Sequence, residues 1–119
     1  MIQTLSLRYT AEIKRNIKPY SNSRQSAMSV ITALELIAGA KNKKKQIEVS
    51  KTIKAYLFLD VTPAIGARAF TLVKKYGLMH TIGIADALIA ATAIENKLQL
   101  YTDNVSDYEF IKELKLFKP

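Results

Sequence analysis

Apolar and polar residues alternate along this chain in short strand-like runs and longer helix-like segments. From residue 27 onward, the apolar runs typical of buried strands cover residues 27–31, 57–61 and 98–102. Between and after them lie segments with apolar residues at helical spacing, at about residues 32–40, 49–57, 63–76, 86–96 and 105–114, the last of which is a short helix or turn. Alternating β and α units of this size predict a parallel sheet with helices on both faces.

Two of the predicted helices carry clear end signals. Thr32 has the chemistry of an N-cap, and Glu35 stands three residues later, which is the spacing of a capping box. Thr62 and Pro63 are typical of an N-cap and a first helical position, and Gly77 is typical of a helix end. The first 25 residues are less regular: a short strand is predicted within residues 1–7, and a helix that ends before Pro19.

The few carboxylates follow predicted strands or open predicted helices. Glu35 comes soon after residues 27–31, Asp103 and Asp107 come directly after residues 98–102, and Asp86 heads an alanine-rich helix. In parallel sheets the functional crevice lies at the carboxyl ends of the strands. Small alanine side chains would let the helix approach the sheet, which would bring Asp86 to the same edge.

Each of these acids also has a purely structural explanation. Asp86 fits an N-cap, Glu35 fits a capping box, and Asp103 and Asp107 fit a polar turn. Taken together, however, crowded carboxylates raise one another's pKa values unless a cation neutralises them, and Mg²⁺ prefers oxygen ligands. The joint pattern therefore predicts a metal site, at which a divalent ion would activate water and stabilise charge on a phosphate.

Composition narrows the function classes. The 119 residues indicate one domain, and the net charge of +8, from 18 Lys plus Arg against 10 Asp plus Glu, permits a nucleic acid partner without naming one. The chain has no cysteine, which excludes disulfides and thiolate metal sites and fits a reducing cytoplasm. One histidine is too few for a histidine-based zinc site, and no apolar run is long enough for a membrane span, so no membrane association is expected.

Three motifs then occur in a characteristic order: SVITALEL at 29–36, IADALIAATA at 84–93 and YTDNVSDY at 101–108. Through them, residues 27–119 resemble the VapC-like ribonuclease toxins of the PIN-domain family, and residues 1–25 form an atypical N-terminal segment of the same single domain, 1–119. The resemblance implies a three-layer α/β/α fold with a central, mainly parallel sheet. It also implies dependence on Mg²⁺ or Mn²⁺, endonucleolytic cleavage of RNA, a homodimer and a cognate antitoxin protein.

By position, the resemblance assigns Glu35, Asp86 and Asp107 as catalytic residues that hold the metal, with Asp103 as an additional carboxylate. Thr102 and Asn104 would orient these ligands and water from a second layer. The lysines expected to hold the RNA backbone are Lys41, Lys43, Lys44 and Lys45.

One family feature is missing. Members of the family begin with a strand that ends in an Asp-Thr-Asn or Asp-Thr-Ser motif, and nothing in residues 1–25 matches it, since the only acid there is Glu12. Either the gene is truncated or rearranged at its 5′ end, or the N-terminus has diverged while the remaining acids still bind metal. Loss of one carboxylate is expected to weaken Mg²⁺ binding and slow turnover. The alternative hypothesis is a catalytically inactive PIN-like module that binds RNA or an antitoxin.

Overall fold

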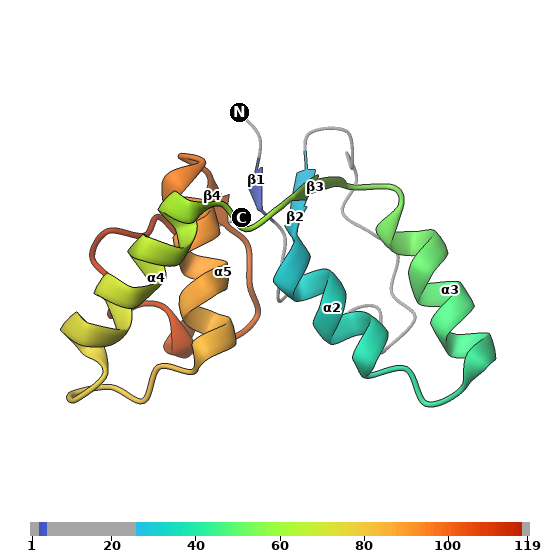
Figure 1. Ribbon diagram of the computed structural model, residues 1–119, viewed down its shortest axis with the longest axis horizontal. Coiled ribbons are helices and arrows are strands. Elements are labelled where there is room, and N and C mark those ends of the chain that lie inside the picture. The colour runs from blue at the N-terminus through green and yellow to red at the C-terminus, as the bar shows by residue number, and fades with distance from the viewer. Residues whose placement is uncertain (1–2, 5–25, 118–119) are drawn as a thin grey trace.

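The computed structural model describes residues 3–4 and 26–117 (Figure 1). Its strands are β1 (Gln3–Thr4), β2 (Ser26–Ser29), β3 (Leu57–Leu59) and β4 (Gln99–Leu100). Its helices are α2 (Val30–Ala38), α3 (Lys43–Ile53), α4 (Pro63–Tyr76) and α5 (Ile84–Glu95), followed by the short 3₁₀ helix η2 (Val105–Asp107). The helix predicted before Pro19 lies outside the described residues.

The strands form one parallel sheet in the order β3-β2-β1-β4. Gln3 of β1 pairs with Ser26 on one side and with Gln99 on the other, and Met28 of β2 pairs with Phe58 of β3. The prediction of a parallel sheet is therefore confirmed, and the strand predicted within residues 1–7 is present as the short central strand β1.

Helices cover both faces of this sheet, as the alternation of side chains at the end of β4 shows. Leu100 packs into one apolar cluster with side chains from α4 and α5, whereas the next residue, Tyr101, packs into a second cluster with Met28 and side chains from α2 and α3. Successive residues of an extended chain point to opposite faces. The α4–α5 pair and the α2–α3 pair accordingly lie on opposite sides of the strands, which is the predicted three-layer arrangement (Figure 1).

Helix α2 begins three residues earlier than predicted. Its N-cap is Ser29, whose hydroxyl accepts the backbone N–H of Thr32 at 3.1 Å and lies 2.9 Å from the Thr32 hydroxyl. Both side chains are buried, so this paired cap satisfies polar groups that water cannot reach. The predicted capping box of Thr32 and Glu35 is therefore wrong, and the strand is shorter than expected because residues 30 and 31 are already helical.

Helix α3 also begins earlier than predicted. Asn42 caps it by accepting the N–H of Lys45 at 2.9 Å. The connection between α2 and α3 therefore ends at Asn42, and the three lysines at 43–45 form the first turn of α3.

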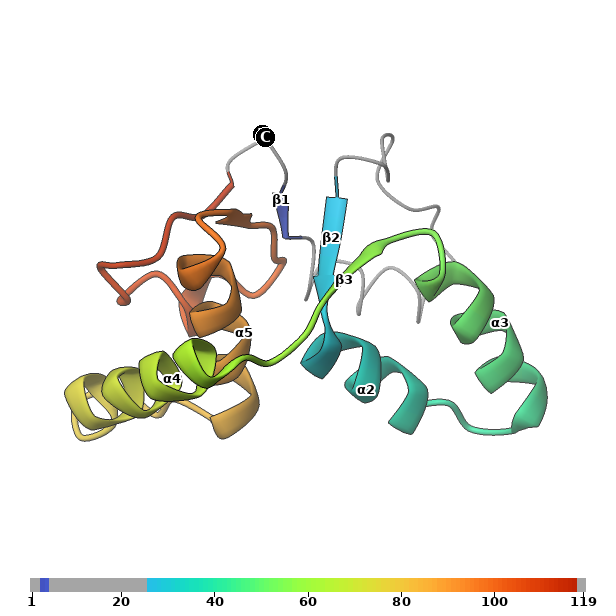
Figure 2. The same ribbon diagram turned by 45° about the horizontal axis from the view of Figure 1, so that its top comes forward.

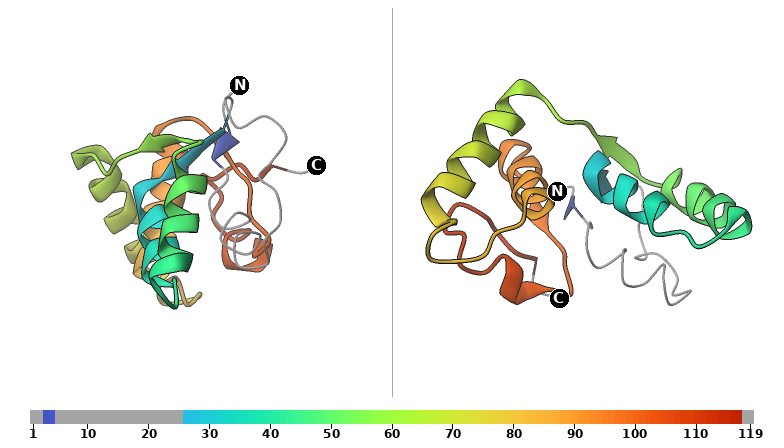
Figure 3. Two further views of the ribbon diagram at one scale, coloured as in Figure 1. Left: turned by 90° about the vertical axis from the view of Figure 1, so that its right-hand side faces the viewer. Right: turned by 60° about the horizontal axis from the view of Figure 1, so that its bottom comes forward.

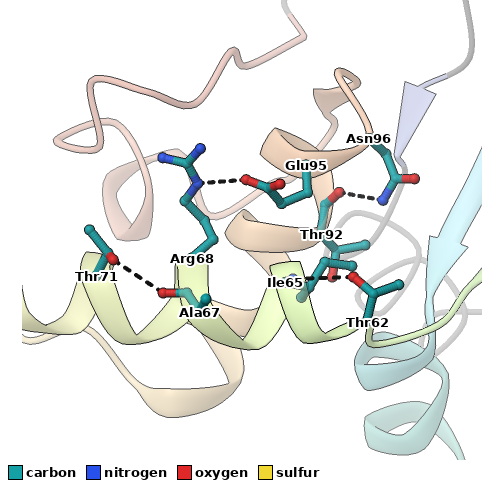
Figure 4. Close-up of polar contacts among 8 residues, drawn as sticks. All are labelled: Thr62, Ile65, Ala67, Arg68, Thr71, Thr92, Glu95 and Asn96. Carbon is teal, nitrogen blue, oxygen red and sulfur yellow. Dashed lines mark hydrogen bonds and ion pairs between the residues drawn. The ribbon is translucent and has the colours of Figure 1, made fainter.

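Helices α4 and α5 form a tight pair. Thr62 caps α4 by accepting the N–H of Ile65 at 3.2 Å, and Gly77 follows its last residue, both as predicted. Arg68 of α4 donates to Glu95 of α5 at 2.7 Å across the pair (Figure 4). The alanines of α5 that face the core are fully or almost fully buried: Ala87, Ala90, Ala91 and Ala93. Their small size lets α5 lie close both to α4 and to the sheet.

The connection from the α2–α3 pair to the α4–α5 pair runs through β3. This strand follows the end of α3, pairs with β2 as the edge strand of the sheet and leads directly into α4 (Figures 2 and 3). None of the helices within residues 26–117 combines the length and the apolar character needed to cross a membrane.

The packing of α4 yields a stability prediction. Leu72 is 0% exposed at the centre of the α4–α5 cluster, whereas Leu34 on α2 is 59% exposed. We expect Leu72→Ala to lower the free energy of unfolding by about 2–5 kcal/mol, through lost burial and the cavity left behind. The same change at Leu34 should alter it by less than about 1 kcal/mol, because surface substitutions have small effects. Urea denaturation measures both, and equal losses would contradict the described packing.

Candidate functional site

The N-terminus of α5 lies beside the C-terminal ends of the strands. Helix α5 leads into β4 through a tight turn in which Lys97 adopts a left-handed conformation, with φ 57°. Its C-terminus therefore lies near the start of β4. Because twelve helical residues span about 18 Å, the first turn of α5 reaches the other end of the strands, where they have their C-termini. Asp86 stands in that first turn, where a negative charge is also favoured by the helix dipole.

Asp86 makes a hydrogen bond to the C-terminal part of the chain. Its Oδ1 accepts the hydroxyl of Tyr108 at 3.0 Å, and Tyr108 itself is 0% exposed. The helix N-cap is Gly83, so the structural interpretation of Asp86 as an N-cap is wrong. The Asp86 carboxylate thus faces Tyr108 instead of capping the helix.

The negative charges of the three predicted acids all influence Tyr108. Burial raises the pKa of Tyr108 well above its ordinary value, and the negative charges of Asp86, Glu35 and Asp107 raise this pKa further. Burial also raises the pKa of Asp86, against the lowering effect of the Tyr108 hydrogen bond, and the charge of Asp107 adds to the rise in that pKa. The carboxylates of α2, α5 and η2 therefore all lie near enough to this hydroxyl to influence it.

Glu35 is placed by the start of α2. The buried Ser29–Thr32 cap fixes where the helix leaves β2, at the same edge of the sheet. Glu35 stands almost two turns into the helix with an exposed side chain. Its position thus depends on the helix start, and the cap itself is made by other residues.

The loop after β4 positions Asp107. Thr102 is buried, and its hydroxyl accepts the backbone N–H of Asn104 at 3.0 Å, while the Asn104 carbonyl accepts the N–H of Asp107 at the same distance. These bonds shape the turn from which η2 begins. Asp103 is exposed on this turn, and the acid whose charge raises the pKa of Asp86 is Asp107 and not Asp103. Thr102 and Asn104 support the loop, and their described bonds are with its backbone.

The candidate ligands are carboxylate oxygens, the kind of ligand that a hard divalent cation prefers. All the converging groups are carboxylates, and the repulsion that raises the pKa of Asp86 is the kind that a bound cation relieves. Within the described ranges, no three Asp, Glu or His side chains are grouped closely enough to hold one ion. Mg²⁺ commonly takes only one or two carboxylates and completes its shell with water and phosphate oxygens, so the residues fit such an ion.

The four predicted RNA-binding lysines lie apart from these acids. Lys41 precedes α3, and Lys43, Lys44 and Lys45 form its first turn, all with exposed side chains. Helix α2, about 13 Å long, lies between the end of β2 and the segment that leads into α3. The nearest described acid is Glu48, 3.4 Å from the Lys45 ammonium.

Sequence reasoning missed Tyr108 as part of the site. Tyr101 and Tyr108 both pack in the core, where they are 6% and 0% exposed. The available signal in the sequence was the position of Tyr108 directly after Asp107. Neighbouring residues of an extended or turning chain point apart, so an inward Tyr108 accompanies an outward Asp107.

Comparison with known proteins identifies the family. The PIN domain family matches residues 9–110 of this chain. Ribonuclease VapC10 of Mycobacterium tuberculosis is 36% identical over 90 residues, which cover 75% of this chain and 67% of that protein. Ribonuclease VapC1 of Methanocaldococcus jannaschii is 32% identical over 93 residues, covering 76% and 67%.

Solved structures show the same fold. The DNA-bound VapBC structure from Salmonella typhimurium matches with a TM-score of 0.84 at 22% identity, covering 98% of each chain. VapBC-1 from nontypeable Haemophilus influenzae matches with a TM-score of 0.76 at 23% identity, covering 99% of this chain and 98% of the other. Together with the motifs and the parallel sheet, these similarities show that the chain belongs to the PIN-domain family, in its VapC-like group.

Proposed function

We propose that this protein is a metal-dependent endoribonuclease, the toxin of a toxin–antitoxin pair that acts in the cytoplasm. The observation that carries the proposal is the hydrogen bond that holds Asp86 against the buried hydroxyl of Tyr108, the residue next to Asp107. Relatives at 36% and 32% identity are named as ribonucleases, which supports RNA as the substrate.

In this proposal one or two of Asp86, Asp107 and Glu35 bind Mg²⁺ or Mn²⁺ directly and the remaining acid acts through bound water, since no three described acids are grouped closely enough to hold one ion. When bound, such a cation lowers the pKa of water and stabilises the charge that develops on the phosphate. The side chains of this protein supply the negative charge, the orientation of the ligands and the shaped loop after β4. Asp103, on the same loop, adds negative charge nearby, and Thr102 and Asn104 keep the loop in place.

The lysines at the start of α3 would bind the RNA backbone. A helix N-terminus favours negative charge, yet the first turn of α3 holds no acid and three lysines. Their placement therefore works against the stability of the helix. Exposed cations gathered at this point would instead attract phosphate groups, with Lys41 extending the same surface.

We further propose a homodimer and a cognate antitoxin as protein partners. The solved structures with the same fold include toxin–antitoxin complexes. Five large apolar side chains stand exposed on α4, on the segment after it and at the start of α5: Phe70, Val73, Leu78, Met79 and Ile84. Exposed apolar surface of this kind is typical of protein interfaces.

The competing function is a catalytically inactive module that binds RNA or an antitoxin. It is favoured by the lack of a grouped three-carboxylate site in the described part of the chain, and by the absence of the family's Asp-Thr-Asn or Asp-Thr-Ser motif from residues 1–25. The two functions differ in whether carboxylate substitutions change RNA cleavage.

Substitution of Asp86 tests the nuclease directly. We expect Asp86→Asn to lower the rate of Mn²⁺-dependent RNA cleavage by at least about 100-fold, because even groups outside the first layer of ligands typically contribute roughly 10–100-fold. The measurement is single-turnover cleavage of a mixture of structured RNAs, with and without Mn²⁺.

Asp60→Asn is the matched control for this experiment. Asp60 is exposed directly after β3, and its carboxylate accepts the N–H of Val61. Three strand spacings, about 14 Å, separate β3 from β4 at the two edges of the sheet. The Asp60→Asn variant should cleave RNA at the same rate as the wild type. Equal rates for Asp86→Asn and the wild type would favour the inactive module.

The raised pKa of Asp86 predicts that the site reduces stability. When a carboxyl group has a higher pKa in the folded state than in the unfolded state, the protein becomes less stable as the pH rises through the folded pKa, because the buried group then carries its charge. We therefore expect Asp86→Asn to be more stable than the wild type at pH 7. The difference should vanish well below pH 4, where the carboxyl is protonated in both states.

Glu113→Gln provides the opposite sign under the same conditions. Hydrogen bonds from Tyr76 and Lys75 lower the pKa of Glu113 to about 2. The stability it contributes is therefore present above its unfolded pKa and lost as the pH falls toward 2. Urea denaturation at pH 7 and at low pH should show Glu113→Gln destabilised at pH 7. A destabilised Asp86→Asn at pH 7 would contradict the electrostatic description of the site.

The lysines of α3 yield a salt-dependence prediction. Replacing Lys43 and Lys44 together by Gln should weaken RNA binding, and should reduce the slope of log affinity against log salt by about 0.7 for each lost phosphate contact. Filter binding at several salt concentrations measures this slope. Lys51→Gln with Lys54→Gln, at the other end of α3, removes the same charge and should have a smaller effect. Equal effects of the two pairs would indicate nonspecific attraction.

A further inference from the structure

We propose that Tyr108 is a positioning residue, whose hydroxyl bonds to Oδ1 of Asp86 and thereby orients a carboxylate that would hold a divalent cation. The inference rests on the proposed function, since it concerns the same metal site. It adds a residue from the core that never touches RNA or metal and sets how one ligand is presented.

The two oxygens of Asp86 lie in different surroundings. Oδ1 accepts the Tyr108 hydroxyl at 3.0 Å. Oδ2 lies toward Gly83, where a Cβ atom, if one were present, would stand 3.9 Å away. Because residue 83 has no side chain, nothing from it covers Oδ2. A carboxylate held at one oxygen in this way cannot turn freely, so its other oxygen keeps one direction.

Tyr108 can hold this position because its ring is locked in the core. It is among the largest fully buried side chains and packs in the cluster that includes Ala87 of α5, Ile111 and Leu114. The hydroxyl therefore cannot follow Asp86 if that side chain turns away. Since Asp107 is the neighbouring residue, the same ring also fixes the spacing between the loop that carries Asp107 and the helix that carries Asp86.

A second tyrosine–carboxylate pair in this molecule shows what a purely structural bond looks like. Tyr76 donates to Glu113 at 2.6 Å, and Lys75 lies 2.9 Å from the same carboxylate. That pair includes its own cation. Among the described residues, no lysine or arginine forms an ion pair with Asp86, and its nearby charges are other acids. The Asp86–Tyr108 pair thus differs from the Tyr76–Glu113 pair in having no cationic partner among the described residues.

The test measures Mn²⁺ binding to the purified full chain by calorimetry, without RNA. We expect Tyr108→Phe to weaken Mn²⁺ binding by about tenfold or more, the usual effect of removing a group that orients a ligand. Tyr76→Phe is the matched control: it removes the hydroxyl of the other tyrosine–carboxylate pair and should leave Mn²⁺ affinity unchanged. Thermal melts of each variant establish that it is folded.

A double variant separates positioning from general destabilisation. If Tyr108 acts through Asp86, then Tyr108→Phe should weaken Mn²⁺ binding no further in the Asp86→Asn background. Weakened binding in Tyr108→Phe with wild-type binding in Tyr76→Phe supports the inference, even if both variants melt at a lower temperature. Unchanged Mn²⁺ affinity in a folded Tyr108→Phe overturns it, and so do additive losses in the double variant.

The outcomes also distinguish this inference from the proposed function. If Asp86→Asn binds Mn²⁺ as well as the wild type, or if the wild type binds none, the metal site itself is wrong and both proposals fail. If Asp86→Asn loses binding while Tyr108→Phe keeps it, the nuclease site stands and only the role of Tyr108 is rejected.

Discussion

The structure of the candidate site depends on one hydrogen bond, from the buried hydroxyl of Tyr108 to Asp86. It joins the first turn of α5 to the segment after β4, which are 22 residues apart in the chain. A buried polar group must find a partner, and here each of the two groups satisfies the other. Because Tyr108 is anchored among apolar side chains, the bond also transmits the rigidity of the core to the carboxylates at its edge.

The alanine-rich sequence of α5 makes this bond geometrically available. Ala87 and Ala90 on its buried face are 1% and 0% exposed, so the helix axis lies close to its neighbours. A helix with larger side chains would stand farther from the sheet and from the C-terminal segment, and Asp86 would then point into solvent. The small residues therefore set how closely α5 approaches its neighbours, while larger side chains such as Ile89 and Leu72 add buried apolar area to the same cluster.

Much of this arrangement follows from local sequence signals. The parallel sheet, the α4 cap at Thr62 and the helix end at Gly77 were predicted from spacing and residue chemistry, and the structure agrees. The start of α2 was not, because Ser29 and Thr32 are both good caps, and only the burial of both hydroxyls selects Ser29. The inward position of Tyr108 depends on tertiary packing, which spacing along the chain cannot reveal.

The placement of the acids and bases shows how a basic chain can hold a local negative site. The lysines of the α3 first turn are kept from the acids by the length of α2, so they neither neutralise Asp86 nor compete with a cation for it. In a structure built only for stability, a lysine beside Asp86 would offset its burial, as Lys75 does for Glu113. Burial raises the pKa of Asp86, and no lysine or arginine among the described residues forms an ion pair with its carboxylate. Both effects lower the free energy of unfolding of the metal-free protein. A divalent cation bound beside Asp86 would relieve them, and this relief would contribute to the free energy of binding.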